Sequence, residues 1–218
     1  MTEYEKMTAG QLYNAEVPEL RDMRLRAAKL CHQLEQLSPD REKERSALLR
    51  ELLGTVKGSC TINPGFHCDY GSNITVGNNF YANYNCVILD CAPVTFGDNV
   101  FIAPNCGFYA AGHPLDAPTR NSGLEFAKPI TVEDDVWIGG SVTVLPGVTI
   151  GKGSVIGAGS VVTHDIPAGV VAVGNPCRPI KKNRIKRAPS FFGWALFFYT
   201  FRASRAKSAA WARSAWSG

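Results

Sequence analysis

The chain has 218 residues, of which 45% are hydrophobic and 19% charged, a composition that can bury a full core and is typical of a globular protein. Residues 1–180 carry all 19 acidic residues and 14 basic ones, whereas residues 181–218 carry nine basic residues and no acid. The charged N-terminus has no apolar signal segment, and none of the seven cysteines stands in a C-x-x-C pair, which argues against secretion, a disulfide framework and a zinc cluster. We therefore expect a cytoplasmic protein.

The N-terminal segment, residues 1–58, is predicted to be mainly helical. Over residues 8–53, Ser38-Pro39 is placed to begin a second helix and Gly54 to end it. Apolar residues of the first helix recur at three- and four-residue spacing: Leu20, Met23, Ala27, Leu30 and Leu34. We expect a helical hairpin that packs against the rest of the chain.

Residues 59–180 contain a repeat with a period of six, which fits neither an amphipathic helix nor an isolated strand. The repeated apolar positions form three runs: Val76, Ala82 and Ile88; Phe96, Ile102 and Phe108; and Val132, Ile138, Val144, Ile150, Ile156 and Val162. Short strands separated by tight corners produce this period when three six-residue sides close one turn of a triangular prism. Gly139, Gly151 and Gly157 follow repeat positions and suit corners that need a small residue or a positive φ. The sequence therefore predicts a mainly β protein, a β-helix of hexapeptide repeats.

Residues 110–129 interrupt the repeat and are expected to leave the prism as a protruding loop, the kind of segment that often carries function. This loop holds His113, one of only four histidines in the chain. Because the pKa of histidine suits proton transfer near neutral pH, His113 is the leading candidate for a general base. No Walker A loop or G-x-G-x-x-G run occurs, so the sequence does not favour nucleotide hydrolysis or dinucleotide binding.

Residues 181–218 form a basic and aromatic tail. An apolar run at 191–201, eleven residues long, lies between two basic segments and is too short to span a bilayer. Such a tail suits an anionic membrane surface or a protein partner, and a role without any catalytic contribution is equally compatible with it.

Over residues 6–180 the chain resembles the maltose/galactoside O-acetyltransferase family. The motifs that carry the resemblance are Met7-Thr8-Ala9-Gly10 with Leu12-Tyr13 and Pro18-Glu19-Leu20, Tyr70 to Asn85, Gly112-His113-Pro114, Val136 to Gly140, Ile156 to Ser160, and Gly174 to Arg178. The resemblance implies a left-handed parallel β-helix preceded by helices, and a homotrimer. It implies an enzyme that moves an acetyl group from acetyl-CoA to a small-molecule hydroxyl acceptor, a sugar or glycoside, without a metal or nucleic acid.

The resemblance also assigns catalytic roles. His113 would take the proton from the acceptor hydroxyl, which then attacks the thioester directly. Glu125 would orient the imidazole, and Asn83 would line the reacting end of the site. The backbone amide of Gly140 or Ser141 would stabilise the oxyanion.

Cofactor and acceptor contacts follow in the same way. The residues implied for acetyl-CoA are Gly140, Ser141, Ala158, Thr163, Arg178 and Lys181, the last two meeting phosphates. The residues implied for the acceptor are Asp69, Tyr81, Asn83 and Asp90. The chain departs from the family at Val17 and Cys91, where other members have acidic residues, so the identity of the sugar stays open.

The sequence is also compatible with other functions. An acetyltransferase for a xenobiotic, an antibiotic or a small alcohol would share these motifs, and a non-catalytic β-helix adaptor subunit would share the repeat. A γ-type carbonic anhydrase would need three histidines at one metal site, and the histidines here are isolated.

Overall fold

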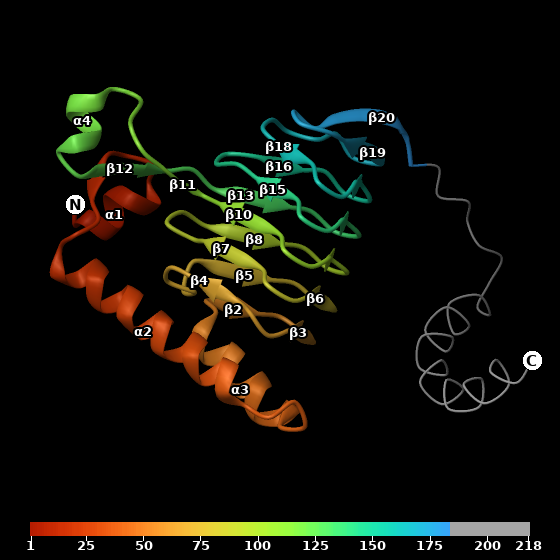
Figure 1. Cartoon of the computed structure of the whole chain (residues 1–218), viewed down its shortest axis with the longest axis horizontal. Coiled ribbons are helices and arrows are strands. Elements are labelled where there is room, and N and C mark those ends of the chain that lie inside the picture. The colour runs from red at the N-terminus through yellow and green to blue at the C-terminus, as the bar shows by residue number, and fades with distance from the viewer. Residues whose placement is uncertain (184–218) are drawn as a thin grey trace, which may run out of the picture. The chain divides into compact units, whose positions relative to one another are not determined.

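A computed structural model describes residues 1–183, which form one compact unit (Figure 1). Apart from its first three residues, the tail predicted at 181–218 lies outside the described residues. Within residues 1–183, none of the helices has the length and apolar character needed to cross a membrane.

Three parallel sheets form the sides of the prism, and each coil of the chain adds one strand to each sheet in turn. The first face consists of β2 (Thr55–Val56), β5 (Ile74–Val76), β8 (Val94–Phe96), β13 (Ile130–Val132) and β16 (Thr149–Ile150). The second face consists of β3 (Cys60–Ile62), β6 (Phe80–Ala82), β9 (Phe101–Ile102), β14 (Trp137–Ile138), β17 (Val155–Ile156), β19 (Val170–Val173) and the antiparallel β20 (Arg178–Lys182). The third face consists of β4 (His67–Cys68), β7 (Val87–Leu89), β10 (Gly107–Tyr109), β15 (Thr143–Val144) and β18 (Val161–Val162). The predicted hexapeptide-repeat β-helix is confirmed.

The interior of the prism is built from the predicted repeat positions. All twelve of them are at most 1% exposed, because each points inward and stacks on the same position one coil away. Phe96 lies at the centre of the earlier coils, with its ring centroid 5.0 Å from that of Phe80 and 5.1 Å from that of Phe108. These contacts bury the large apolar area that stabilises a fold with very short strands.

At some corners the backbones of successive coils approach each other closely, and at others the backbone adopts a left-handed conformation. A Cβ on Gly139 would lie 2.6 Å from the Ala158 nitrogen of the next coil, so only glycine fits there. Asn79, Asn99 and Asp135 stack at one corner with φ between 56° and 60°, and the Asn99 side chain accepts from Asn79 at 3.0 Å and donates to Asp135 at 3.0 Å. Asparagine and aspartate tolerate this conformation better than other side chains.

Helices α1 (Glu3–Thr8), α2 (Pro18–Gln36) and α3 (Glu42–Leu52) precede the coils, and α2 and α3 form the predicted hairpin. The predicted start of the second helix is wrong: α3 begins at Glu42 with Arg41 at its N-cap, and Ser38-Pro39 lies in the connection. Pro18 does open α2, as the first helical residue.

Residues 9–17 also differ from the helical prediction. They contain β1 (Tyr13–Asn14), which pairs with β12 (Leu124–Ala127) of the protruding loop. The loop has regular structure of its own, β11 (Ala111–Gly112), α4 (Ala117–Asn121) and β12, and forms a three-stranded sheet in the order β1-β12-β11. The N-terminal segment thus supports the loop directly (Figure 1).

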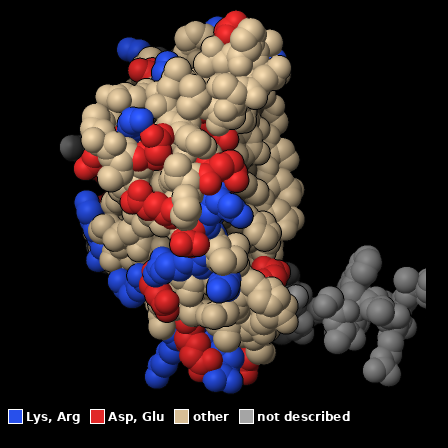
Figure 2. Space-filling view, turned by 90° about the vertical axis from the view of Figure 1, so that its left-hand side faces the viewer, with Lys and Arg blue, Asp and Glu red and all other residues tan. Residues whose placement is uncertain are grey.

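Charged side chains gather on the side of the molecule where α2 and α4 lie. Figure 2 shows basic and acidic residues intermixed over this side. Arg24 lies 3.2 Å from Glu16 and Arg26 lies 4.0 Å from Glu51, and exposed pairs of this kind contribute little to stability.

Candidate active site

The loop hairpin brings His113 and Glu125 to one place. In the antiparallel pair β11–β12, Ala111 lies opposite Ala127 and Gly112 opposite Phe126, so the next position along places His113 opposite Glu125. A Cβ on Gly112 would meet the Phe126 ring at 2.7 Å, so glycine lets the two strands approach. The His113 side chain is exposed, as a base that must meet a substrate has to be.

Glu125 is held from behind by Tyr13. The Tyr13 hydroxyl donates to Glu125 Oε2 at 2.8 Å, and Tyr13 itself is 0% exposed. Burial, followed by the neighbouring Cys91 and Glu125, raises the pKa of the Tyr13 phenol well above its ordinary value. Sequence reasoning assigned Tyr13 no role, because only the pairing of β1 with β12 reveals its partner.

Asp69 and Cys91 complete a partly buried polar group that we call the junction cluster: Tyr13, Asp69, Cys91 and Glu125. The Cys91 thiol donates to Asp69 Oδ2 at 3.3 Å and is 4% exposed. Burial raises the pKa of Asp69, while the hydrogen bond from Cys91 and the charge of Arg24 oppose this shift. Asp69, half-buried, is the member of the predicted acceptor set that stands in this cluster.

Asp90 does not present its carboxylate to a ligand in this structure, contrary to its predicted contact with the acceptor. It is 0% exposed, and its carboxylate accepts backbone N–H groups of Asp69, Tyr70 and Asn73 at 3.1, 2.8 and 3.2 Å. Burial raises the pKa of this carboxyl, and these backbone donors oppose the shift. Asp90 therefore fixes the turn that carries Asp69.

Val17, the other position at which the chain departs from the family, is the N-cap residue of α2 and makes no side-chain cap hydrogen bond. An acidic residue there would be placed to cap the helix, so the departure bears on α2 itself.

Tyr81 and Asn83 lie on β6 and the corner that follows it. Asn63 Nδ2 donates to the Tyr81 hydroxyl at 2.9 Å and approaches Asn83 Oδ1 at 3.4 Å. Asn83 Oδ1 also accepts from the Tyr84 backbone N–H at 2.8 Å, which leaves the amide nitrogen of Asn83 to act as a donor. Asn85 has φ 59° and donates to Asn105 at 3.1 Å, a corner contact like those described above.

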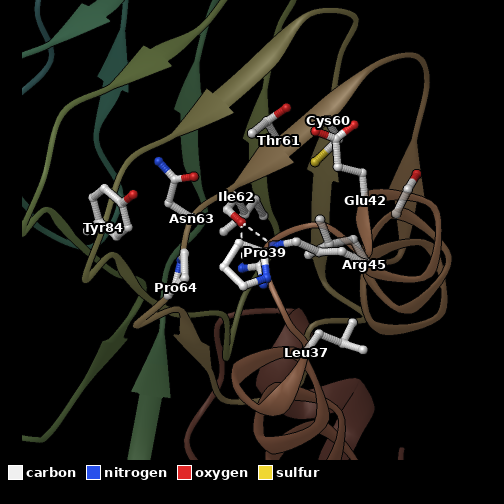
Figure 3. Close-up of a pocket in the computed structure, with 12 residues that line it drawn as sticks. Leu37, Pro39, Glu42, Arg45, Cys60, Thr61, Ile62, Asn63, Pro64 and Tyr84 are labelled. Carbon is white, nitrogen blue, oxygen red and sulfur yellow. Dashed lines mark hydrogen bonds between the residues drawn. The ribbon is translucent and has the colours of Figure 1, made fainter. Parts of the chain in front are cut away.

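A pocket of about 420 Å³ opens between α3 and the first coils (Figure 3). Asn63 and Tyr84 lie at one end, and Arg45 at the other end donates to the Ile62 carbonyl oxygen at 2.7 and 2.9 Å. None of the predicted site residues lines this pocket, so its size does not make it the centre of the chemistry.

Gly140, Ser141 and Ala158 occupy corners that follow second-face strands β14 and β17. Ser141 has φ 57°, and its backbone N–H donates to the Pro104 carbonyl at 2.9 Å, so this amide is engaged within the prism. A Cβ on Gly140 would lie 3.5 Å from the nearest atom, the Pro104 oxygen. Of the two predicted oxyanion donors, Gly140 is therefore the better placed.

The remaining predicted cofactor residues are divided. Arg178 and Lys181 are exposed on β20, at the edge of the second face. Thr163 follows β18 of the third face, and its hydroxyl lies 2.8 Å from His164 Nδ1.

Within one chain, the predicted site residues thus lie at two different corners of the prism. His113, Glu125 and Asp69 follow third-face strands, whereas Asn83, Gly140 and Ala158 follow second-face strands. The width of the third face separates the two groups. Among residues 1–183, no three His, Cys, Asp or Glu side chains converge as metal ligands would.

Comparisons with known proteins agree with this architecture. Residues 6–58 match the maltose acetyltransferase hexapeptide capping motif, and residues 129–164 match the six-repeat bacterial transferase hexapeptide model. A putative acetyltransferase of Saccharomyces cerevisiae is 55% identical, with 82% of this chain and 91% of the relative covered. A galactoside O-acetyltransferase of Escherichia coli is 44% identical, with 82% and 88% covered. A solved structure of a galactoside acetyltransferase in complex with coenzyme A is 42% identical, covers 88% of this chain and 96% of its own, and has a TM-score of 0.83.

Proposed function

The chain belongs to the maltose/galactoside O-acetyltransferase family of hexapeptide-repeat acetyltransferases, and from this membership we propose that it transfers an acetyl group from acetyl-CoA to a hydroxyl of a sugar or glycoside, with His113 as general base. The observation that carries the proposal is the position of His113, exposed and opposite Glu125, on a hairpin that the buried Tyr13 ties to the N-terminal segment.

The base is needed because an alcohol does not ionise near neutral pH; its pKa, like that of water, lies far above this range. His113 removes this proton as the oxygen forms its bond to the acetyl carbon. Glu125, opposite in register, orients the imidazole and stabilises the positive charge that it gains.

Acetyl-CoA supplies an activated acyl carbon. The second face has the features that a long, flexible and anionic donor requires. Gly140 keeps its corner free of a side chain, and the Asn83 amide nitrogen is available as a donor. Arg178 and Lys181 present exposed cations at the edge of the sheet for phosphates. A solved relative is a complex with coenzyme A, which supports acetyl-CoA as the donor.

We propose a homotrimer with a shared site, which would explain why the predicted site residues of one chain lie at two separate corners. If the third-face corner of one subunit lies against the second-face corner of its neighbour, His113 of one chain meets Gly140 and Ala158 of the next. Sedimentation at micromolar concentration should then give three subunits, and a fully active monomer would contradict the shared site.

For the acceptor we propose that Asp69 is the carboxylate that binds its hydroxyls, with Tyr81 and Asn83 of the neighbouring subunit alongside. Asp69 is accessible, whereas Asp90 is not. A screen of acetyl-CoA consumption with sugars, glycosides, antibiotics and simple alcohols identifies the acceptor class.

The decisive test is His113→Ala. We expect kcat to fall by roughly 10²–10⁴-fold, the usual contribution of a general base. The KM for acetyl-CoA should barely change, because we propose that Gly140, Ala158, Arg178 and Lys181, rather than His113, hold the donor. The wild-type kcat should rise with pH over the range in which imidazoles lose their proton, and this limb should vanish in the variant.

The matched control is His32→Ala, which removes an exposed histidine from α2. Its kcat should equal that of the wild type. Near-normal turnover of His113→Ala would remove the base from the mechanism.

A further inference from the structure

Tyr13 belongs to a row of three residues that crosses the small sheet β1-β12-β11. Tyr13 pairs directly with Glu125. His113 follows the last β11–β12 pair, Gly112 with Phe126, and continuing that register places it on the other side of Glu125. Directly opposite residues of antiparallel strands have neighbouring side chains on the same side of the sheet. The row therefore connects a buried phenol, a carboxylate and the exposed imidazole.

The donors of the junction cluster are distributed so that Glu125 keeps its partner. A phenol and a thiol have one proton each. The Tyr13 proton goes to Glu125 Oε2, and the Cys91 proton goes to Asp69 Oδ2, so the two donors do not compete for one carboxylate. With Oε2 engaged, Glu125 Oε1 remains for the imidazole of His113.

Tyr13 stays a donor over the whole working pH range. Its pKa is raised above the ordinary value, mainly by burial, so the phenol does not ionise where the enzyme is assayed. Tyr13 is 0% exposed, so water cannot take the place of its hydroxyl on the side of the Glu125 carboxylate that faces Tyr13.

We propose that Tyr13 is a positioning residue for the reaction: by fixing the Glu125 carboxylate, it fixes the orientation and tautomer of the His113 imidazole. This inference rests on the proposed function, since it assumes that His113 is the base. The alternative is that Tyr13 only anchors the loop to the N-terminal segment.

The test is Tyr13→Phe, which keeps the ring and its packing and removes one oxygen. Glu125 is only half-buried, so water can reach its carboxylate and the variant should fold. We expect kcat to fall roughly 10- to 150-fold, the effect of losing one hydrogen bond to a charged group, with an unchanged KM for acetyl-CoA. Glu125→Gln should lower kcat at least as much, because it removes the carboxylate that Tyr13 holds.

A double-mutant cycle separates positioning from anchoring. If Tyr13 acts through Glu125, adding Tyr13→Phe to Glu125→Gln should change kcat by less than about twofold. The matched control is Tyr4→Phe, which removes another hydrogen bond of 2.8 Å, from Tyr4 of the N-terminal segment to Asn73 Oδ1 of the prism. Tyr4→Phe should leave kcat unchanged.

Two outcomes overturn the inference alone. Wild-type kcat in Tyr13→Phe would do so, and so would a full Tyr13→Phe effect in the Glu125→Gln background, provided that His113→Ala is inactive. An active His113→Ala, measured in the same series, would overturn the proposed function and this inference together.

Discussion

The interior of the coils and the junction cluster are built on opposite principles. Inside the prism, the buried polar residues Ser154 and Ser160 donate their hydroxyls to nearby backbone carbonyls, and apolar side chains fill the rest. At the junction, a phenol, a thiol and two carboxylates are gathered where burial raises the pKa of three of them, Tyr13, Asp69 and Cys91. The coils are arranged for stability, whereas the junction holds groups whose burial is unfavourable, as expected where chemistry is carried out. Substitutions in the coils should therefore change stability more than turnover. Substitutions in the junction cluster should change turnover more than stability.

The largest effect on stability is expected at the centre of the coils. Phe96→Ala removes the ring that contacts both Phe80 and Phe108. We expect the free energy of unfolding to fall by about 3–5 kcal/mol, through lost burial and the cavity left behind. Chemical denaturation at a fixed protein concentration measures this, while kcat per folded enzyme should stay within about twofold of the wild type.

Leu25→Ala is the control for that substitution, because Leu25 is 53% exposed on α2. Its unfolding free energy should hardly change. Equal losses for the two variants would mean that the coil interior does not dominate stability.

A smaller effect is expected at the corner ladder. Asn99→Ala loses contacts to Asn79 and Asp135 and places alanine at φ 56°. The expected loss in unfolding free energy is about 1–3 kcal/mol. Asn99→Gly should recover part of it, because glycine accepts this φ without strain. If glycine proved worse than alanine, the backbone conformation would not be the cause.

Asp69→Asn is expected to have the smallest effect on stability, and to increase stability rather than lower it. The pKa of Asp69 is raised in the folded state, so the folded protein holds its proton more tightly than the unfolded chain. The contribution of Asp69 to stability therefore falls as pH rises from the ordinary value of about 4 through the raised pKa. Asparagine removes this penalty, so the variant should gain about 0.5–1 kcal/mol at neutral pH and nothing near pH 4.

The same variant separates stability from function. If Asp69 binds the acceptor, the KM for the acceptor should rise while the protein becomes more stable. Denaturation curves at several pH values, together with acceptor titrations, test both parts, and a variant less stable than the wild type at neutral pH would contradict the first.

The two regions also differ in how far the sequence predicts them. The coil interior follows from a local period, since each position such as Val144 or Ile150 repeats the environment of the residue six places earlier. The junction cluster cannot be predicted from such a period, because β1 has only two residues and Glu125, the partner of Tyr13, lies 112 positions away. The sequence alone places Asp90 among the acceptor residues, because it does not distinguish an exposed carboxylate from one that accepts three backbone N–H groups.

The pairing of β1 with β12 also has a consequence for the order in which the chain folds during synthesis. The ribosome adds about 5–20 residues per second, so Tyr13 emerges roughly 5–20 s before Glu125. Meanwhile α2, α3 and the first coils can pack on one another, because each coil contacts only its neighbours along the prism. The N-terminal strand must wait with its phenol unpaired until the loop has been made, so the sheet that carries His113 is completed only after several coils are already in place.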